Sequence, residues 1–189
     1  MRIDRTFNWL GRFPLGVDLA DTVRVVGSRQ IELLVDDASL TAWVAAEVPR
    51  YPAAEGALGH LGEVRELRDA VRDVLFAQTN GRHLPSHQVA TLNEASATCP
   101  SFPTLTRGGL LQNVEVNTSP FDIFRATVAR STMKTLNADA TALAVCHAPS
   151  CGMFFVPADR RQTWCSPGCG NRARVARHAA RTGNGARDG

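Results

Sequence analysis

Hydrophobic residues recur at helical spacing over several stretches of the chain. The clearest stretch is 58–81, in which apolar side chains return every three or four residues and Arg and Glu fill the positions between them. Its apolar positions are Leu61, Val64, Leu67, Val71, Val74 and Leu75. The pattern predicts a long amphipathic helix that ends at Asn80-Gly81, because glycine is favoured just after a helix.

Three further helices are predicted in the same way. Residues 36–48 predict a helix capped by Ser39, and a shorter helix opens at Pro85-Ser86. The stretch from Pro120 to Val145 predicts a long helix that leads directly into Cys146. The apolar stripes of the three are Leu40, Trp43, Val44 and Val48; then Val89, Leu92 and Ala95; then Phe121, Phe124, Val128, Met133, Leu136, Ala140 and Leu143.

Other segments follow a different pattern. Residues 101–117 alternate between apolar and polar around Gly108-Gly109, which predicts a small antiparallel hairpin with a two-residue turn. Residues 13–23 predict a short strand or a first helical turn, in which Asp18 and Asp21 share a face and act as caps. The glycine-rich residues 184–189 predict a frayed tail.

The composition is that of a folded protein. The 189 residues suffice for one domain with a core and a small appendage, and a hydrophobic content of 44% with 21% charged residues is ordinary for such a chain. The first residues lack the apolar segment of a secretory signal, and no apolar run approaches the ~20 residues of a membrane span. We therefore expect a cytoplasmic protein with no membrane partner.

Charge is distributed unevenly along the chain. Residues 160–189 contain seven Arg and one acid, Asp188, and so carry +6; the net charge of +3 leaves 3 − 6 = −3 for residues 1–159. A basic C-terminal end on a mildly acidic body indicates a polyanionic partner.

Four of the five cysteines lie close together in the sequence. They form Cys146-x4-Cys151 and Cys165-x3-Cys169, with thirteen residues between the pairs. Two such pairs suit a tetrahedral Zn²⁺ ion, and four protein ligands leave no position for a catalytic water, so one structural zinc is expected. An iron–sulfur centre and two disulfides are the alternatives, and His147 could replace one cysteine.

The residues around the cysteines support a zinc finger. Gly152 would allow a tight turn after Cys151, and Phe154, Val156 and Trp164 could cover the metal with apolar surface.

The segment "CHAPSCGMFFVPADRRQTWCSPGCGNRARVARHAAR" resembles the CGNR zinc finger, whose defining tetrad is here Cys169-Gly170-Asn171-Arg172. In that family the finger follows a mostly helical ABATE domain, and members are described as stress-induced or transcriptional regulators. Upstream, "GVDLADTV", "LLVDDASLTAWVAAE" and "EVRELRDAVRDVLFAQ" are similar to motifs of that domain. One departure is Asp21-Thr22, where the family commonly has Asn-Thr.

The motifs and patterns together define the expected architecture. We expect an α+β protein with a mostly helical ABATE-like domain at 1–141 that contains the small hairpin. A treble-clef-like or ribbon zinc finger at 142–183 follows and ends in a basic helix.

The last helix would carry a cationic stripe. At ~100° per residue, Arg174, Arg177, His178 and Arg181 share about a third of its circumference. Val175, Ala176 and Ala179 lie on the other side and would pack on the finger. Arg172 and Asn171 fall outside the stripe, and we expect them to support the finger by capping, by bonding a ligand sulfur or by pairing with Asp159.

Guanidinium groups match phosphate oxygens, so the stripe, together with Arg160 and Arg161, is expected to bind the backbone of double-stranded DNA. The predicted function is therefore a zinc-binding transcriptional regulator in which the N-terminal domain senses a small molecule or a partner protein, with a homodimer possible. The alternative is an interaction or sensing module whose finger is purely structural.

Enzymatic activity is not expected. His60, His83 and His87 stand apart from any nucleophile motif, and Pro85 interrupts the one close pair. Cys99 is predicted to be a buried or loop thiol, and no glycine-rich phosphate loop is present.

Overall fold

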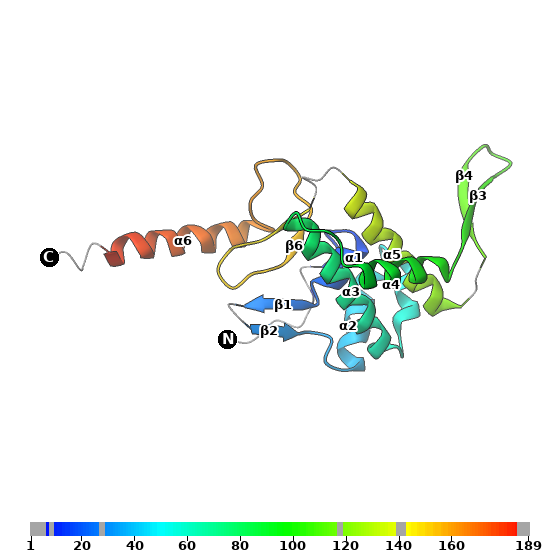
Figure 1. Ribbon diagram of the computed structural model, residues 1–189, viewed down its shortest axis with the longest axis horizontal. Coiled ribbons are helices and arrows are strands. Elements are labelled where there is room, and N and C mark those ends of the chain that lie inside the picture. The colour runs from blue at the N-terminus through cyan, green and yellow to red at the C-terminus, as the bar shows by residue number, and fades with distance from the viewer. Residues whose placement is uncertain (1–6, 8–9, 27–28, 117–118, 139–142, 185–189) are drawn as a thin grey trace.

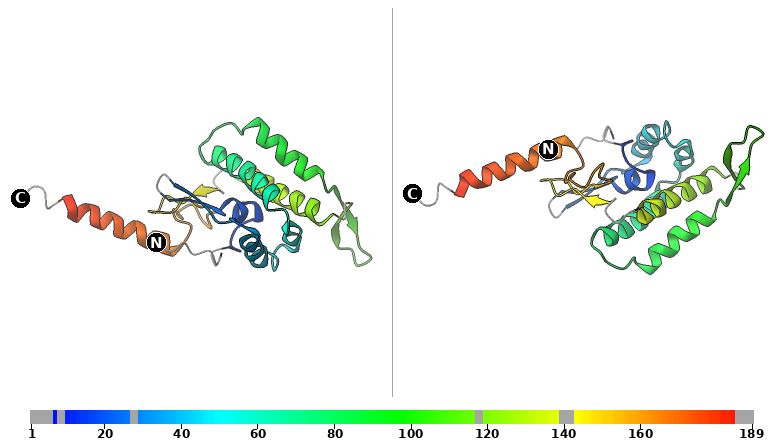
Figure 2. Two further views of the ribbon diagram at one scale, coloured as in Figure 1. Left: turned by 90° about the horizontal axis from the view of Figure 1, so that it is seen from below. Right: turned by 90° about the horizontal axis from the view of Figure 1, so that it is seen from above.

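Three helices form the body of the protein. The computed structural model describes residues 7, 10–26, 29–116, 119–138 and 143–184. Helices α3 (Leu61–Thr79), α4 (Ser86–Ala97) and α5 (Pro120–Asn137) pack on one another, and the short helix α1 (Leu15–Ala20) packs on α3 and α5 with every residue buried (Figures 1 and 2). The predicted helix at 58–81 is confirmed, and Gly81 follows it with φ +61°.

Two shorter elements close the core beside α5. Helix α2 (Asp37–Glu47) inserts Trp43 edge-on against Phe124, with ring centroids 6.2 Å apart. The 3₁₀ helix η1 (Pro52–Ala57) approaches the start of α5 so closely that a Cβ on Gly56 would lie 2.0 Å from the Pro120 carbonyl oxygen. Only glycine fits at that contact.

The start of α2 corrects the predicted cap. Asp36, not Ser39, is the N-cap residue: its Oδ1 accepts from the Ser39 N–H at 2.8 Å. Ser39 occupies the third helical position, and its hydroxyl oxygen accepts from the Asp36 N–H at 3.0 Å. The two residues form a reciprocal capping box, in which serine takes the place of the more usual Glu or Gln.

Three separate two-stranded antiparallel sheets occur among the described residues. They are β1 (Val23–Val26) with β2 (Arg29–Glu32), β3 (Ser101–Leu105) with β4 (Leu111–Glu115), and β5 (Ala144–Val145) with β6 (Phe154–Phe155). The predicted hairpin at 101–117 is therefore present. Its turn differs from the prediction, because residues 107–109 lie between the paired Thr106 and Leu110 and only Gly109 has a positive φ.

The helix predicted to run into Cys146 ends early. Helix α5 stops at Asn137, the predicted position Ala140 lies outside the described residues, and Ala144–Val145 is a strand. Pairing of β5 with β6 overrides the helical spacing, since it brings Cys146 N–H to the Met153 carbonyl at 2.9 Å. The predicted domain boundary at 141–142 also lies outside the described part of the chain.

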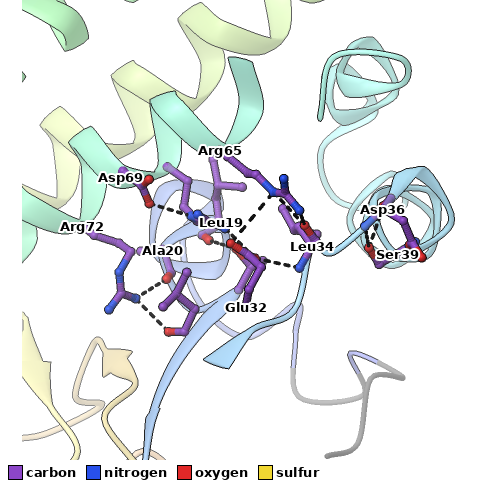
Figure 3. A network of polar contacts seen from close by, with 12 residues as sticks. Leu19, Ala20, Glu32, Leu34, Asp36, Ser39, Arg65, Asp69 and Arg72 are labelled. Carbon is purple, nitrogen blue, oxygen red and sulfur yellow. Dashed lines mark hydrogen bonds and ion pairs between the residues drawn. The ribbon is translucent and has the colours of Figure 1, made fainter. Parts of the chain in front are cut away.

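Arginines of α3 join the body to the β1–β2 hairpin (Figure 3). Arg68, on the face predicted to be solvent-exposed, is only 3% exposed and donates to Glu32 Oε1 at 2.7 Å. Arg72 donates to the carbonyl oxygens of Ala20 and Val23 at 2.5 and 2.8 Å. The buried Arg68 is satisfied by a carboxylate and the half-buried Arg72 by main-chain oxygens, as burial of charge requires.

Asp18 and Asp21 are both fully buried. Asp21 occupies the C-cap position of α1, whereas Asp18 lies inside the helix, so the capping prediction is wrong for Asp18. Asp18 accepts from Gly11 N–H and from Arg50 Nη1, each at 3.1 Å, which places a carboxylate inside the core between α1 and the end of α2. The apolar neighbours of both aspartates in the sequence were the only hint of this burial.

No helix within the described part of the chain combines the length and the apolar character needed to cross a membrane.

Candidate metal centre and basic helix

The four clustered cysteines come from two turns of the chain. Cys146 follows β5, and Cys151 closes the next turn by donating its N–H to the Ala148 carbonyl at 2.9 Å. Cys165 precedes helix α6 (Pro167–Asn184), and Cys169 lies in the first turn of that helix. The β5–β6 pairing closes the loop that carries Cys146 and Cys151.

Their sulfur atoms surround a common point. All four Sγ atoms lie within 4.8 Å of one another. The Cys151–Cys165 and Cys165–Cys169 Sγ distances are 3.8 and 3.4 Å. Zn–S bonds of ~2.3 Å in a tetrahedron require S···S separations of about 3.8 Å, so the cysteines fit one Zn²⁺ ion. All five cysteines are free thiols, which excludes the two-disulfide alternative here.

Crowding of the thiols affects their ionisation. Hydrogen bonding with the Cys165 thiol lowers the pKa of Cys151 to about 4, whereas the same contact raises the pKa of Cys165. Burial raises the pKa of Cys146. One thiolate therefore forms readily while its neighbours resist a second negative charge, and a divalent cation is what allows all four to ionise.

Glycines allow close packing on both sides of the cluster. A Cβ on Gly152 would lie 2.9 Å from Val25 Cβ, so Gly152 serves close approach to β1; the predicted tight turn is not supported by a positive φ there. A Cβ on Gly170 would lie 3.1 Å from Trp164 Cδ1, which shows that Trp164 packs against the first turn of α6.

The first turn of α6 is fixed by local hydrogen bonds. Pro167 opens the helix, two residues before Cys169. The Ser166 hydroxyl accepts from the Cys169 N–H at 3.2 Å. The helix N-terminus thus carries the last thiol of the cluster.

Arginines balance the charge of the centre. Arg172 Nη2 donates to Cys169 Sγ at 2.9 Å, one of the roles predicted for Arg172. Arg12 and Arg24 line the hollow beside Cys151, Cys165 and Cys169. Because one Zn²⁺ with four thiolates carries −2, nearby guanidinium groups offset that charge. Asn171 instead lies exposed, and its Oδ1 accepts from Arg174 Nη1 at 3.2 Å.

Comparison with known proteins agrees with this geometry. Residues 14–148 match the ABATE family, described as "Putative stress-induced transcription regulator", and residues 143–182 match the CGNR zinc finger. The chain belongs to the ABATE family. No curated protein matches the chain. The CGNR finger of this ABATE protein accordingly holds the four-cysteine set expected for a single zinc ion.

The finger packs directly on the ABATE body. Phe154, Phe155, Cys146 and Cys169 belong to the same apolar core as α1, α3 and α5. Asp21 Oδ1 accepts from the Phe154 N–H at 2.8 Å, and the Arg72 guanidinium lies over the Phe154 ring, 5.7 Å from its centroid. Phe154 therefore joins finger to body, whereas the sequence suggested only that it covers the metal.

The remaining helix α6 projects from the body (Figures 1 and 2). Beyond the buried Ala173, every residue from Arg174 to Arg181 is exposed, including Arg174, Arg177, His178 and Arg181. The predicted packing of Val175, Ala176 and Ala179 on the finger is wrong: Val175 is 60% exposed, because the finger covers only the first two turns.

Other predicted residues lie on the surface near the finger. Arg160 and Arg161 are exposed in the loop between β6 and α6, and Arg161 N–H donates to Asp159 Oδ1 at 2.7 Å. His147 is exposed and is not a member of the four-ligand group. Cys99, predicted to be a buried or a loop thiol, is buried.

Proposed function

We propose that this protein is a DNA-binding transcription regulator in which the zinc finger fixes α6 and α6 contacts the phosphate backbone. The observation that carries the proposal is the exposed cationic stripe on α6, held at its base by Cys169 and Arg172. Residues 160–184 contain six arginines and no acid.

The stripe is available for a ligand. Arg174, Arg177 and Arg181 pair with no carboxylate among the described residues; the nearest groups they contact are Asn171 Oδ1 and helix carbonyl oxygens. At ~1.5 Å per residue, the 18 residues of α6 extend about 27 Å, long enough to follow a DNA groove or backbone.

The positive surface continues onto the finger. Arg12, Arg161 and Arg174 line one shallow hollow beside Trp164 at the base of α6. These guanidinium groups come from three different segments of the chain, and together they could bind several phosphates in a row. The proposed DNA contact therefore includes the finger as well as α6.

Fluorescence anisotropy with duplex DNA over a salt series tests the proposal. Three or four arginine–phosphate contacts give a log–log salt slope of about −3 to −4, at ~0.9 per contact. The triple variant Arg174, Arg177, Arg181→Ala should lose most of this slope and at least tenfold in affinity.

A matched pair of double variants controls for net charge. Arg29 and Arg82 are also exposed but lie outside α6, so Arg29, Arg82→Ala removes the same charge as Arg174, Arg177→Ala. Equal binding losses in the two double variants would refute a specific role for α6 and leave only general electrostatic attraction.

The proposal treats the chain as a binding protein and not as an enzyme. A four-cysteine zinc site has no open position for substrate or water, which supports a structural role for the metal.

A cavity on the body supports the proposed ligand-sensing role. A cavity of about 470 Å³ lies between the base of the β3–β4 hairpin and α5 and reaches Val156 of the finger. Its lining includes Tyr51, Asn113, Glu115, Arg130 and Lys134, the last being the only lysine of the sequence. Two cations against one carboxylate leave the lining net positive, which favours a small amphipathic anion.

Thermal unfolding with a panel of aromatic carboxylates and sugar phosphates tests that site. A stabilising compound should lose its effect in Lys134→Glu and keep it in Lys134→Arg. Compounds that stabilise both variants equally would place the binding elsewhere.

A further inference from the structure

The β3–β4 hairpin is an apolar ribbon exposed to solvent. It extends from the body at the end opposite to α6 (Figure 1). Its exposed large apolar residues, with their exposed fractions, are Phe102 51%, Leu105 73%, Leu110 71%, Leu111 74%, Val114 36% and Val116 60%. The register puts Phe102, Leu110, Val114 and Val116 on one face of the ribbon, and an exposed apolar face of this kind marks an interaction site.

The ribbon receives little support from the rest of the chain. Its two strands pack mainly on each other, and no third strand joins them in the described structure. An isolated two-stranded hairpin is at best marginally stable in water and gains stability from additional strands. The ribbon therefore has a physical requirement for a partner.

The two outer edges of the ribbon differ. Thr106 N–H donates to the Leu110 carbonyl, and Val116 N–H donates to the Pro100 carbonyl. Hydrogen-bonded and non-hydrogen-bonded pairs alternate along an antiparallel ladder. The N–H and C=O groups of residues 101, 103 and 105 on β3 therefore point away from β4. Pro103 removes the donor from the middle of that edge and blocks it. On β4 the outward residues are Leu111, Asn113 and Glu115, all with N–H groups, and that edge is open.

We propose that β4 pairs antiparallel with β4 of a second copy of this chain, about a two-fold axis at Asn113, to form a four-stranded sheet. In this register Leu110 lies opposite Val116 of the second copy, on the face that also carries Phe102 and Val114. A two-fold interface requires such self-complementarity.

Charge does not oppose this arrangement. The ribbon carries only two charged residues, Arg107 at the tip and Glu115 near the base. In the register above, Glu115 lies opposite Leu111 of the second copy, and Arg107 lies in the turn beyond the paired residues. No like charges therefore face each other across the pair of strands.

The exposed area suits a weak dimer. Of the six apolar side chains, only those next to the paired edge can be covered by it, namely Leu110, Leu111, Val114 and Val116, because Phe102 and Leu105 lie on β3, one strand away. This area is below the ~800 Å² per partner of a standard interface.

Analytical ultracentrifugation of the zinc-loaded full chain from 1 to 200 µM tests the proposal. A concentration-dependent dimer is expected. Asn113→Pro removes an outward N–H without breaking a bond within the ribbon and should weaken the dimer at least tenfold, whereas Asn113→Ala keeps the N–H and should dimerise as the wild type does.

Hydrogen exchange separates loss of pairing from loss of the ribbon. In Asn113→Pro the outward amides of Leu111 and Glu115 should lose protection, while the inward amides of Gln112 and Val114 keep it. Sedimentation as a monomer at every concentration, with rapid exchange of the outward amides in the wild type, would overturn the proposal and assign the ribbon to a different protein. A Pro variant that dimerises normally with an intact ribbon would overturn it as well.

Discussion

The carboxylate of Asp21 and the backbone N–H of Phe154 form a 2.8 Å hydrogen bond between residues 133 positions apart in the sequence. Asp21 is fully buried at the end of α1, and Phe154 belongs to β6, the strand that follows the first pair of cysteines. This bond fixes the zinc finger against the helical body, and Gly152 allows the close approach.

Replacing Asp21 tests how the finger docks. Burial raises the pKa of Asp21 well above its ordinary value, and Oδ2 has no partner among the described residues. A group with a raised folded-state pKa contributes stability at low pH and loses it as pH rises. Asp21→Asn keeps the acceptor without the charge, so we expect stability equal to or above that of the wild type at pH 8.

Asp21→Ala leaves the Phe154 N–H buried without its acceptor and should cost about 1–3 kcal/mol. Urea unfolding at pH 6 and 8 measures the effects of both Asp21 replacements. If Asp21→Asn were less stable than the wild type and Asp21→Ala equally stable, the bond from Phe154 N–H to Asp21 would not be what holds the finger.

Zinc content should depend on the clustered cysteines alone. Elemental analysis of the purified protein is expected to find one zinc per chain in the wild type and almost none in Cys165→Ser. Cys99→Ala is the matched control, because Cys99 is a buried cysteine outside the cluster and its replacement should leave the zinc in place. Equal metal content in all three proteins would contradict the site.

Arg172 should tune the metal without binding it. Arg172→Met removes the donor to Cys169 Sγ, and loss of such an outer contact typically lowers metal affinity 10–100-fold. Competition with a chromophoric chelator measures the change. Arg174→Met is the control, because Arg174 lies two residues further along α6 and bonds Asn171 instead of a sulfur atom. This variant should leave zinc affinity unaltered. An equal drop in zinc affinity in both variants would show that the loss of net charge is the cause.

Stability should fall between pH 6 and 8 because of a buried carboxyl pair. Burial raises the pKa of Glu47 to about 8 and that of Asp18 to about 6, with Arg50 as their shared cation. Below pH 8 the folded protein retains a proton on Glu47 that the unfolded chain has lost, so unfolding becomes easier as pH rises through this range.

At ~1.4 kcal/mol per pH unit, Glu47 costs about 2 kcal/mol of stability between pH 6 and pH 8. Glu47→Gln should flatten the dependence and be the more stable protein at pH 8. Denaturant melts of the two proteins at several pH values decide this, since the contribution of the zinc ligands cancels in the difference. Parallel curves for wild type and variant would rule out Glu47 as the source.

Local patterns in the sequence were enough to predict several helices and the hairpin at 101–117. The helical spacing of α3 and the alternation around Gly108-Gly109 were sufficient to predict these elements, and cysteine spacing was sufficient for the metal ligands. Where residues contact a distant segment, the pattern failed. Ala144 and Val145 continue a helical stripe, yet they pair with Phe154 and Phe155, which no local rule indicates.

The burial of charged side chains could not be predicted from the sequence either. Arg68, Asp18 and Asp21 look like surface residues, and only tertiary partners make their burial possible. The reverse error occurred on α6, where Val175 was expected to pack but has no neighbouring layer to cover it.

The positions of the ribbon and α6 at opposite ends of the molecule affect what an assembly could do on a chromosome. Two copies joined through their ribbons would carry their basic helices at the far extremities of the assembly. Such a dimer would be too elongated to seat both helices on adjoining half-sites, and it would instead bridge separate segments of duplex, holding a loop between them.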